Sequence, residues 1–204
     1  MKSIPKPPAT SPTHILLATF LALMQLAAGA SALYAQQITV KLAPEQTKVE
    51  FSLGATMHTV HGSFQLKSGS MTFDTASGKA DGRIVVDATS GESGDSSRDV
   101  RMEKDVLESG KYPEIVFIPS KIEGQIPAQG AFRVVIHGLL RLHGGDHQLD
   151  AAVQGTRTPI AITASTDFVI PYAKWGLKNP SKFLLHVSGE VQIHVEIAVV
   201  QRVL

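Results

Sequence analysis

The stretch Leu185-His-Val-Ser-Gly-Glu-Val-Gln-Ile-His-Val-Glu-Ile197 alternates between apolar and polar residues over its whole length. Its odd-numbered positions hold Leu, Val, Gly or Ile, whereas its even-numbered positions hold His, Ser, Glu or Gln. Because successive side chains of a β-strand point to opposite faces, this pattern predicts a strand with one apolar and one solvated face. Such a strand has to bury its apolar face against other parts of a sheet.

The same period of two recurs along the chain from Ile38 onward. Long runs lie at 132–142 and 160–168, and shorter ones lie at 49–53, 64–66, 71–73, 84–86, 115–117 and 149–153. Glycine-rich or polar segments, which are typical of turns, lie between them at 67–69, 75–78, 123–124 and 143–146. Short alternating strands joined by turns predict an all-β, antiparallel sheet that forms a sandwich or closes into a barrel.

One segment, residues 96–107, lacks this alternation and mixes a few apolar residues with many charged ones. Asp95 or Ser96 can cap the N-terminus of a helix at this point, and Gly110 and Pro113 are typical of its end. The sequence therefore predicts a short helix that crosses between strands over an open end of the sheet. The Arg98-Asp99 pair at its start either holds the helix to a turn or binds the head group of a ligand.

Residues 1–35 have the pattern of a secretory signal peptide, with a basic start, an apolar run at 15–30 and small residues after it. Cleavage sites follow Ala30, Ala32 and Ala35. The apolar run is shorter than the roughly 20 residues of a membrane-spanning helix, so cleavage is expected rather than anchoring. We therefore expect an exported, periplasmic or extracellular protein whose mature domain spans residues 36–204 and contains no integral membrane span.

Composition excludes several classes of function. The chain has no cysteine, which excludes thiol nucleophiles, disulfides and zinc–thiolate sites. Two of its 19 Lys and Arg residues precede residue 36, which leaves 17 basic residues against 18 acidic ones. A mature chain with so little net charge does not suit a nucleic-acid partner, which favours a strongly basic face. Neither the charge nor the composition predicts an oligomeric state.

Histidines raise the question of a metal site, above all at His58-x-x-His61 and His143-x-x-x-His147. On a strand, however, positions i and i+3 point to opposite faces, and the second pair spans a predicted turn. The chain also lacks a Gly-x-Ser-x-Gly elbow and a phosphate-binding loop. We expect a binding protein with no metal, cofactor or catalytic residue. A metal-dependent enzyme and a structural or interaction module on the same barrel are the alternatives.

Four segments, in this order and spacing, resemble the YceI-like polyisoprenoid-binding proteins. They are 44–53, Val60-His-Gly-Ser-Phe64, the block from Arg98-Asp99 to Lys111-Tyr-Pro-Glu-Ile-Val-Phe117, and Leu140-Arg-Leu-His-Gly144. The resemblance covers about residues 38–197. It departs from the family pattern at 145–148, within 101–110, and in the aromatic loop 172–181, which carries the single tryptophan, Trp175.

The resemblance implies a lipocalin-like, eight-stranded barrel that holds a long-chain isoprenoid or other apolar lipid. A barrel of about eight strands is wide enough for one ligand or can be filled by side chains, and the resemblance favours the ligand. We expect the segments 95–112 and 172–181 to control access, with Trp175 either plugging one barrel end or forming a wall of the ligand mouth. The predicted ligand-binding residues are Phe51, Leu53, Phe64, Phe73, Ile84, Val86, Phe117, Val134, Ile136, Leu140, Ile162, Phe168, Trp175, Val187, Val191 and Arg98.

Overall fold

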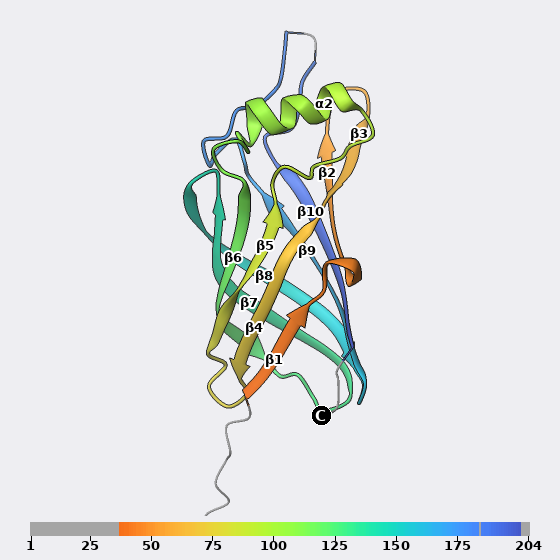
Figure 1. Cartoon of the computed structure of the whole chain (residues 1–204), viewed down its shortest axis with the longest axis vertical. Helices are drawn as coiled ribbons and strands as arrows, with labels where there is room; N and C mark the ends of the chain where they lie inside the picture. The colour runs from red at the N-terminus through yellow and green to blue at the C-terminus, as the bar shows by residue number, and fades with distance from the viewer. Residues whose placement is uncertain (1–36, 184, 201–204) are drawn as a thin grey trace, which may run out of the picture. The chain divides into compact units, whose positions relative to one another are not determined.

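The structure is a computed structural model that describes residues 37–183 and 185–200. These residues form one sheet of ten strands in the order β1-β4-β5-β6-β7-β8-β9-β10-β2-β3 (Figure 1). The strands are β1 (Gln37–Leu42), β2 (Thr47–Gly54), β3 (Thr59–Phe64), β4 (Leu66–Asp74), β5 (Ala80–Asp87), β6 (Glu114–Gly124), β7 (Gly130–Leu142), β8 (Gly145–Arg157), β9 (Ala161–Ile170) and β10 (Val191–Val200). Every neighbouring pair is antiparallel, as the alternation predicts.

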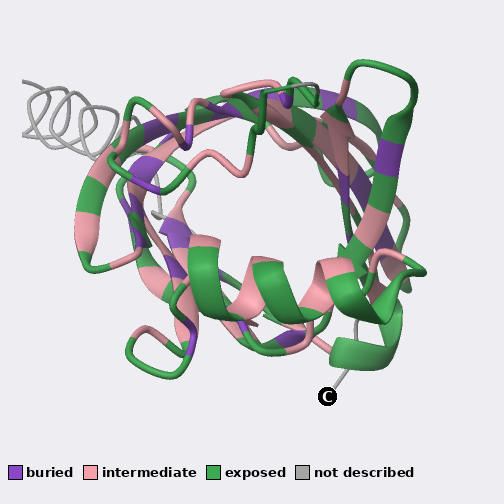
Figure 2. Cartoon of the chain, turned by 90° about the horizontal axis from the view of Figure 1, so that it is seen from above, coloured by how far each residue is buried: buried purple, intermediate pink, exposed green. Residues whose placement is uncertain are grey.

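The ten strands make eight passes around a barrel, because two of the passes are each divided into two strands. The 3₁₀ helix η2 (Pro44–Gln46) separates β1 from β2, and Gln65 alone separates β3 from β4. β1 pairs with β4 and β2 pairs with β3, so the two divided passes run side by side. The first also pairs with β10 and the second with β5, which closes the ring seen in Figure 2. The predicted lipocalin-like, eight-stranded barrel is confirmed.

The ring has a seam along β1. The ladder between β2 and β10 ends at the pair Thr47–Ile197, next to η2. Beyond this point β1 pairs with β4 alone within the described part of the chain. Pro44 marks the break, and proline suits it because its nitrogen carries no hydrogen for a ladder bond. The barrel is therefore a strongly curled sheet, whose first pass is hydrogen-bonded to β10, over the described residues, through β2 and not through β1.

The last strand begins later than the sequence indicates. The alternation predicts a strand from Leu185, whereas β10 begins at Val191 and residues 185–190 contribute only isolated bridges. Ser188 explains the difference, because its carbonyl accepts a hydrogen bond from Tyr172 Oη (2.6 Å) and its N–H donates to Gly54 (2.8 Å). These bonds hold the segment against the loop after β9 and the end of β2, so it does not extend the β9–β10 ladder.

Two further expectations about strands were wrong. Residues 67–69 are not a turn: they lie inside β4, where the register against β5 shifts between Leu66 and Ser68 as in a β-bulge. β1 was not among the predicted runs, although Ile38 and Val40 are buried and alternate with exposed residues. The segment Pro44-Glu-Gln46 forms η2 between β1 and β2. It interrupts the alternation of apolar and polar residues, so the run in β2 does not visibly extend back into β1.

The predicted crossing helix is confirmed at one end of the barrel. It consists of α2 (Ser96–Arg101) and a π-helical turn, η3 (Met102–Val106), and Figure 2 shows it lying across the ring of strands. Asp95, one of the two predicted caps, accepts hydrogen bonds from the backbone N–H groups of Ser97 (2.9 Å) and Arg98 (3.0 Å). An N-terminal cap of this kind satisfies backbone donors that have no partner within the helix.

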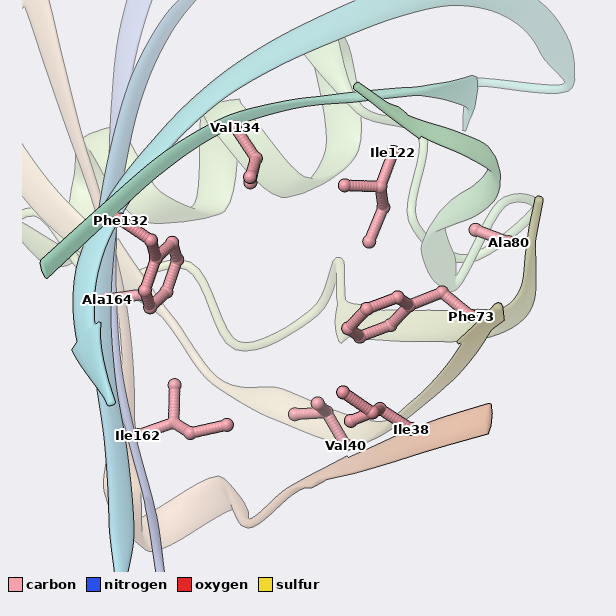
Figure 3. Close-up of a cluster of buried hydrophobic side chains, with 9 residues drawn as sticks. All are labelled: Ile38, Val40, Phe73, Ala80, Ile122, Phe132, Val134, Ile162 and Ala164. Carbon is pink, nitrogen blue, oxygen red and sulfur yellow. The ribbon is translucent and has the colours of Figure 1, made fainter. Parts of the chain in front are cut away.

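Two clusters of buried apolar side chains fill the two ends of the barrel. The cluster at the end away from α2 is drawn in Figure 3 and comprises Ile38, Val40, Phe73, Ala80, Ile122, Phe132, Val134, Ile162 and Ala164. The cluster at the helix end comprises Leu140, Leu142, Leu149, Ile170, Tyr172 and Leu177, with Val106 and Leu107 of the helical segment packed against it. The middle of the barrel lies between these clusters.

Within the described residues, no helix has the length and apolar character needed to cross a membrane. The predicted signal peptide, residues 1–35, and its three cleavage sites lie outside the described residues. The domain boundary at residue 36 and the exported location therefore stay predictions.

Candidate functional site

An apolar cavity of about 210 Å³ lies inside the barrel, between the two buried clusters. Every strand except β3 supplies at least two of its wall residues, and β3 supplies Phe64. None of the residues that line it is titratable. A concave, mostly apolar site is the usual form of a binding site for a small apolar molecule.

Several inward-facing side chains are half-exposed rather than buried. Phe64, Met71, Ile84, Val86 and Phe117 all line the cavity, and each keeps part of its surface uncovered by protein atoms. Side chains of a close-packed core have no such free surface, because cores leave few voids larger than a water molecule. The free surface of these side chains therefore faces the cavity, and it is the apolar area that a ligand would cover.

Three hydroxyl side chains interrupt the apolar wall, those of Thr47, Ser165 and Thr166. The Thr47 hydroxyl donates to the carbonyl of Ala43 (3.0 Å) and is thus satisfied. The Thr166 Oγ1 atom is buried and has no hydrogen-bond partner among the described residues. Because a buried polar atom without a partner is destabilising, Thr166 is the wall position best suited to meet a polar atom of a ligand.

The cavity brings together seven of the sixteen predicted ligand-binding residues. They are Phe64, Ile84, Val86, Phe117, Ile136, Leu140 and Phe168. The other predicted apolar residues lie elsewhere. Phe73, Val134 and Ile162 belong to the cluster of Figure 3, while Leu53, Trp175 and Val191 pack against the helix-end cluster. Phe51 and Val187 are buried outside the cavity wall.

The cavity also uses residues that sequence reasoning did not select. They are mainly apolar residues in the inward-facing phase of the strands, Val40 and Leu42 of the unpredicted β1 among them: Val40, Leu42, Val49, Leu66, Met71, Ile115, Leu149, Ala151, Val153, Ala164, Ile170, Ile193, Val195 and Ile197. The signal that could have found them is the alternation itself. It identifies which face points inward but not the height of a residue along the barrel, and height decides whether a side chain meets the cavity or a filled end.

The Val-His-Gly-Ser-Phe motif has a packing role at the edge of the cavity. Gly62 pairs with Phe51 across β2 and β3, and the rings of Phe51 and Phe64 lie 5.5 Å apart. A Cβ atom at Gly62 would overlap the Phe51 ring and the carbonyl of Glu92. Glycine at this position therefore lets the Phe51 ring lie flat across β3, and Phe51 in turn supports the cavity-lining Phe64.

Arg98 and Asp99 hold the loop that precedes the helix. Arg98 donates from Nε to Ser93 Oγ (2.7 Å) and from its guanidinium to the Ser93 carbonyl (2.7 Å). Asp99 accepts from the Ser93 N–H (2.9 Å) and also from the Ser93 hydroxyl. The neighbouring Glu92 exchanges backbone hydrogen bonds with Ser63 of β3 (2.8 and 3.0 Å). This geometry supports the structural role of the pair, whereas a ligand role for Arg98 stays a prediction.

Trp175 covers the helix-end cluster. Its ring stacks on the imidazole of His147, with the ring centroids 4.0 Å apart and the planes 3° from parallel. Tyr172 and Leu177 of the same loop are buried, and burial raises the pKa of the Tyr172 hydroxyl. Of the two roles considered for this loop, the structure places Trp175 with the plug of the barrel end rather than among the cavity-lining residues.

Two histidines on the outer face, His137 and His194, form hydrogen bonds with carboxylates. His137 contacts Asp150 (2.7 Å) and Glu123 (3.1 Å), and hydrogen bonds to these two carboxylates raise its pKa. His194 contacts Asp167 (2.7 Å), which in the same way raises its pKa. No group of three His, Asp or Glu side chains within the described residues is arranged to hold a metal ion.

The outer face also has two wider hollows, of about 850 and 1120 Å³, whose walls include charged side chains such as Glu50 and Arg133.

The comparison with known families gives the same picture as the barrel and its apolar cavity. The model of the YceI-like domain matches residues 41–199. This chain belongs to the YceI-like family. No curated protein matches it at a significant level.

Several solved structures share the fold of this YceI-like chain. Burkholderia cenocepacia BcnA is 18% identical, with a TM-score of 0.64 over 77% of this chain and 98% of that one. A polyisoprenoid binding domain from Saccharophagus degradans, implicated in plant cell wall breakdown, is 16% identical, with a TM-score of 0.57 over 82% and 100%. The Campylobacter jejuni YCEI protein is 18% identical, with a TM-score of 0.56 over 72% and 88%. At these identities the likeness concerns the fold.

Proposed function

We propose that this YceI-like protein is an exported carrier that holds a polyisoprenoid or similar long-chain lipid in the barrel cavity. The observation that carries the proposal is the wall of apolar side chains inside the barrel, with free surface facing inward. The Saccharophagus degradans structure, which has the same fold, is a polyisoprenoid binding domain. Export is supported by the signal-peptide pattern of residues 1–35.

Burial of the lipid chain supplies the affinity. Each methylene group that leaves water for an apolar wall contributes about 0.8 kcal/mol, so a chain of a few isoprene units binds firmly without any charged contact. The cavity, at about 210 Å³, is smaller than the roughly 300–1000 Å³ of pockets for drug-sized molecules. Its size therefore favours a single slender chain over a fused ring system.

Binding rather than catalysis suits the site. General acid–base chemistry needs a titratable group within hydrogen-bond reach of the reacting atoms, and none of the cavity-lining residues is titratable. Among the described residues of this wall, the Thr166 hydroxyl is the one buried polar side-chain atom without a hydrogen-bond partner, and a neutral hydroxyl can orient a ligand oxygen by a hydrogen bond. No cofactor has a role in this proposal.

Selectivity belongs to the segments at the helix end. Aliphatic walls distinguish chains weakly, by about 1–3 kcal/mol for each methylene, so they cannot recognise a head group. The segments 95–112 and 172–181 carry basic and aromatic side chains next to the plug of that end. A lipid with a phosphate or quinone head group suits these donors.

The test compares the lipids bound to two neighbouring alanine variants. Ala151 is buried and lines the cavity, whereas Ala152, one position along β8, is exposed on the outer face. Ala151→Phe fills the cavity and should abolish co-purification and uptake of lipid, measured by organic extraction and mass spectrometry. Ala152→Phe adds the same ring outside and should leave the lipid bound.

Two results would overturn the carrier proposal. One is a wild-type protein that yields no lipid and takes up no added polyisoprenoid. The other is equal lipid retention by folded Ala151→Phe and wild-type proteins. Export is tested separately, by cell fractionation and by sequencing the N-terminus of the recovered protein, and a chain that still begins at Met1 in the cytoplasm would contradict it.

A further inference from the structure

Two loops meet at the helix end of the barrel and form one projecting surface. They are the β2–β3 connection, residues 55–58, and the segment made of residues 181–183 and 185–187. The Thr56 N–H donates to the His186 carbonyl (2.9 Å), and the His186 N–H donates to Thr56 Oγ1 (2.8 Å). Figure 1 shows the second segment projecting beyond α2. The two loops are therefore coupled and present their side chains together.

Three large apolar side chains on these loops face solvent. Phe183 has a relative exposure of 101%, Met57 of 88% and Leu185 of 39%. Single exposed apolar residues are common on proteins, as at Ile160, which is 66% exposed at the other end of the barrel. Three of them on two hydrogen-bonded loops are a group, and we call Met57, Phe183 and Leu185 the apolar tip. Exposed groups of this kind mark protein or membrane contacts.

The two loops that carry the apolar tip contain basic residues but no acidic ones. Residues 171–188 contain three lysines, Lys174, Lys178 and Lys182, and no acidic residue. All three lysines are exposed. Lys174 approaches Glu190 at 3.5 Å, but both side chains are more than half exposed and the contact is weak. Residues 54–62 contain no Asp, Glu, Lys or Arg. An apolar tip flanked by lysines is complementary to an anionic lipid surface.

Backbone hydrogen bonds join the two sides of the hairpin that carries Phe183. Lys182 and Leu185 exchange two backbone hydrogen bonds, N–H to carbonyl at 2.8 Å and 3.0 Å. Backbone groups that enter the hydrocarbon region without partners are strongly destabilising. This hairpin can therefore carry Phe183 into the boundary between head groups and acyl chains while the backbone groups of Lys182 and Leu185 stay paired.

We propose that the apolar tip docks the protein on an anionic lipid bilayer, with Phe183 and Met57 inserted and the three lysines at the head groups. A projecting tip can enter a bilayer surface, whose lipids move aside. Interfacial membrane anchors likewise place apolar side chains in the bilayer and cationic side chains at the head groups. The docking surface lies outside the barrel cavity, so this inference goes beyond the carrier proposal and does not depend on it.

The absence of cysteine allows a position-specific test. Single cysteines replace Phe183 or Ile160 in the full chain and are labelled with the environment-sensitive dye NBD. Vesicles of phosphatidylcholine with 30% phosphatidylglycerol should shift the emission to the blue and raise it several-fold for the label at residue 183. The label at residue 160, at the other end of the barrel, should not respond. No response at residue 183, or an equal response at both, would overturn the proposal.

Vesicle sedimentation measures the energetic roles of the two kinds of side chain. Wild type and all variants contain the same residues 1–36. Any vesicle binding through the apolar run at 15–30 is therefore the same in all of them. Met57→Ser with Phe183→Ser should lower the vesicle partition constant at least tenfold, whereas Ile160→Ser should not. Replacing the three lysines by glutamine should lower it about fivefold for each lysine that reaches the lipid, because each such contact contributes about 1 kcal/mol.

Two controls identify the occupant of the tip. If the tip instead pairs with a second copy, light scattering will show a dimer that the double serine variant loses, with vesicle binding unchanged, and the proposal is wrong. Ala151→Phe separates the tip from the carrier function, since this variant should lose its lipid but still bind vesicles. Equal binding to vesicles of phosphatidylcholine alone would contradict the anionic surface.

Discussion

The Tyr112 ring lies on the turn at His143, with the two ring centroids 4.7 Å apart. Gly144, the next residue of the turn, lies under the same ring, so that a Cβ atom there would be 2.6 Å from Tyr112 Cε1. The contact joins the Lys-Tyr-Pro and Leu-His-Gly segments, which are separated by some thirty residues in the sequence. Two segments that resemble the YceI-like family are therefore parts of one packing contact near the helix end.

This contact predicts an unequal effect of two glycine substitutions. Gly144 and Gly94 have nearly equal φ values, +79° and +81°, and only Gly144 has a neighbour within 4 Å of an added Cβ. Gly94→Ala should lower the free energy of unfolding by about 1–2 kcal/mol, the strain of a left-handed alanine. Gly144→Ala should lower it by about 2–4 kcal/mol, because overlap with the ring adds to the strain. Urea denaturation measures both, and equal losses would show that the ring moves aside freely.

Arg98 is predicted to stabilise the loop rather than to select the lipid. Arg98→Ala removes two hydrogen bonds to Ser93 and should lower the free energy of unfolding by about 1–3 kcal/mol. Arg101→Ala, which loses one long contact to the carbonyl of Ser97 (3.3 Å), is the matched control and should change it by less than about 0.5 kcal/mol. Mass spectrometry of the bound lipids completes the test. A changed lipid profile in folded Arg98→Ala protein would instead support the head-group role.

The sequence predicts most of the barrel because its strands have one wet face and one apolar face. β7 and β8 illustrate this, since both predicted runs form one long hairpin with the register from Leu142–Gly145 to Gly130–Arg157. Its turn is only His143-Gly144, because Gly145 and Asp146 of the predicted turn at 143–146 already belong to β8. The start of β10 could not be predicted, because the bonds of Ser188 to Tyr172 and Gly54 come from residues distant in the sequence. Local alternation contains no information about such partners.

The cavity could be predicted only in part, for a related reason. Phe64 and Phe73 have the same residue type and both point inward, yet Phe64 faces the cavity and Phe73 belongs to the filled end. What separates them is their height in the barrel, which follows from the tilt and register of all the strands together. The height of a residue along the barrel cannot be read from the sequence of a single strand.

Stability should fall as the pH rises from about 6 to 8, through His137 and His194. Hydrogen bonds to Asp150 and Glu123 raise the pKa of His137, and bonds to Asp167 and Glu196 raise that of His194. A histidine with a raised folded pKa contributes stability that is fully present below its unfolded pKa, near 6.5, and is lost as the pH rises through the folded value. The free energy of unfolding should therefore decrease from about pH 6 to pH 8.

Substitution of both histidines tests the origin of this slope. The double variant His137→Gln with His194→Gln should have a flatter dependence of the free energy of unfolding on pH between about 6 and 8. Urea denaturation at a series of pH values measures it. His58→Gln is the control, since His58 lies exposed in the β2–β3 connection. Coincident pH profiles for wild type and the double variant would show that the carboxylates do not favour the protonated rings.

Phe64 and Phe73 should respond differently when each is shortened to alanine. Phe73 is 4% exposed and packed in the cluster of Figure 3, so Phe73→Ala leaves a new void and should cost about 3–5 kcal/mol of stability. Phe64 already borders the cavity and loses fewer contacts, so Phe64→Ala should cost less than Phe73→Ala. Lipid retention should show the reverse order, because Phe64→Ala removes part of the wall that covers the chain. Urea denaturation and lipid extraction on the same preparations decide the matter: if Phe73→Ala loses its lipid while folded and Phe64→Ala keeps it, the lipid lies in the filled end and not in the cavity.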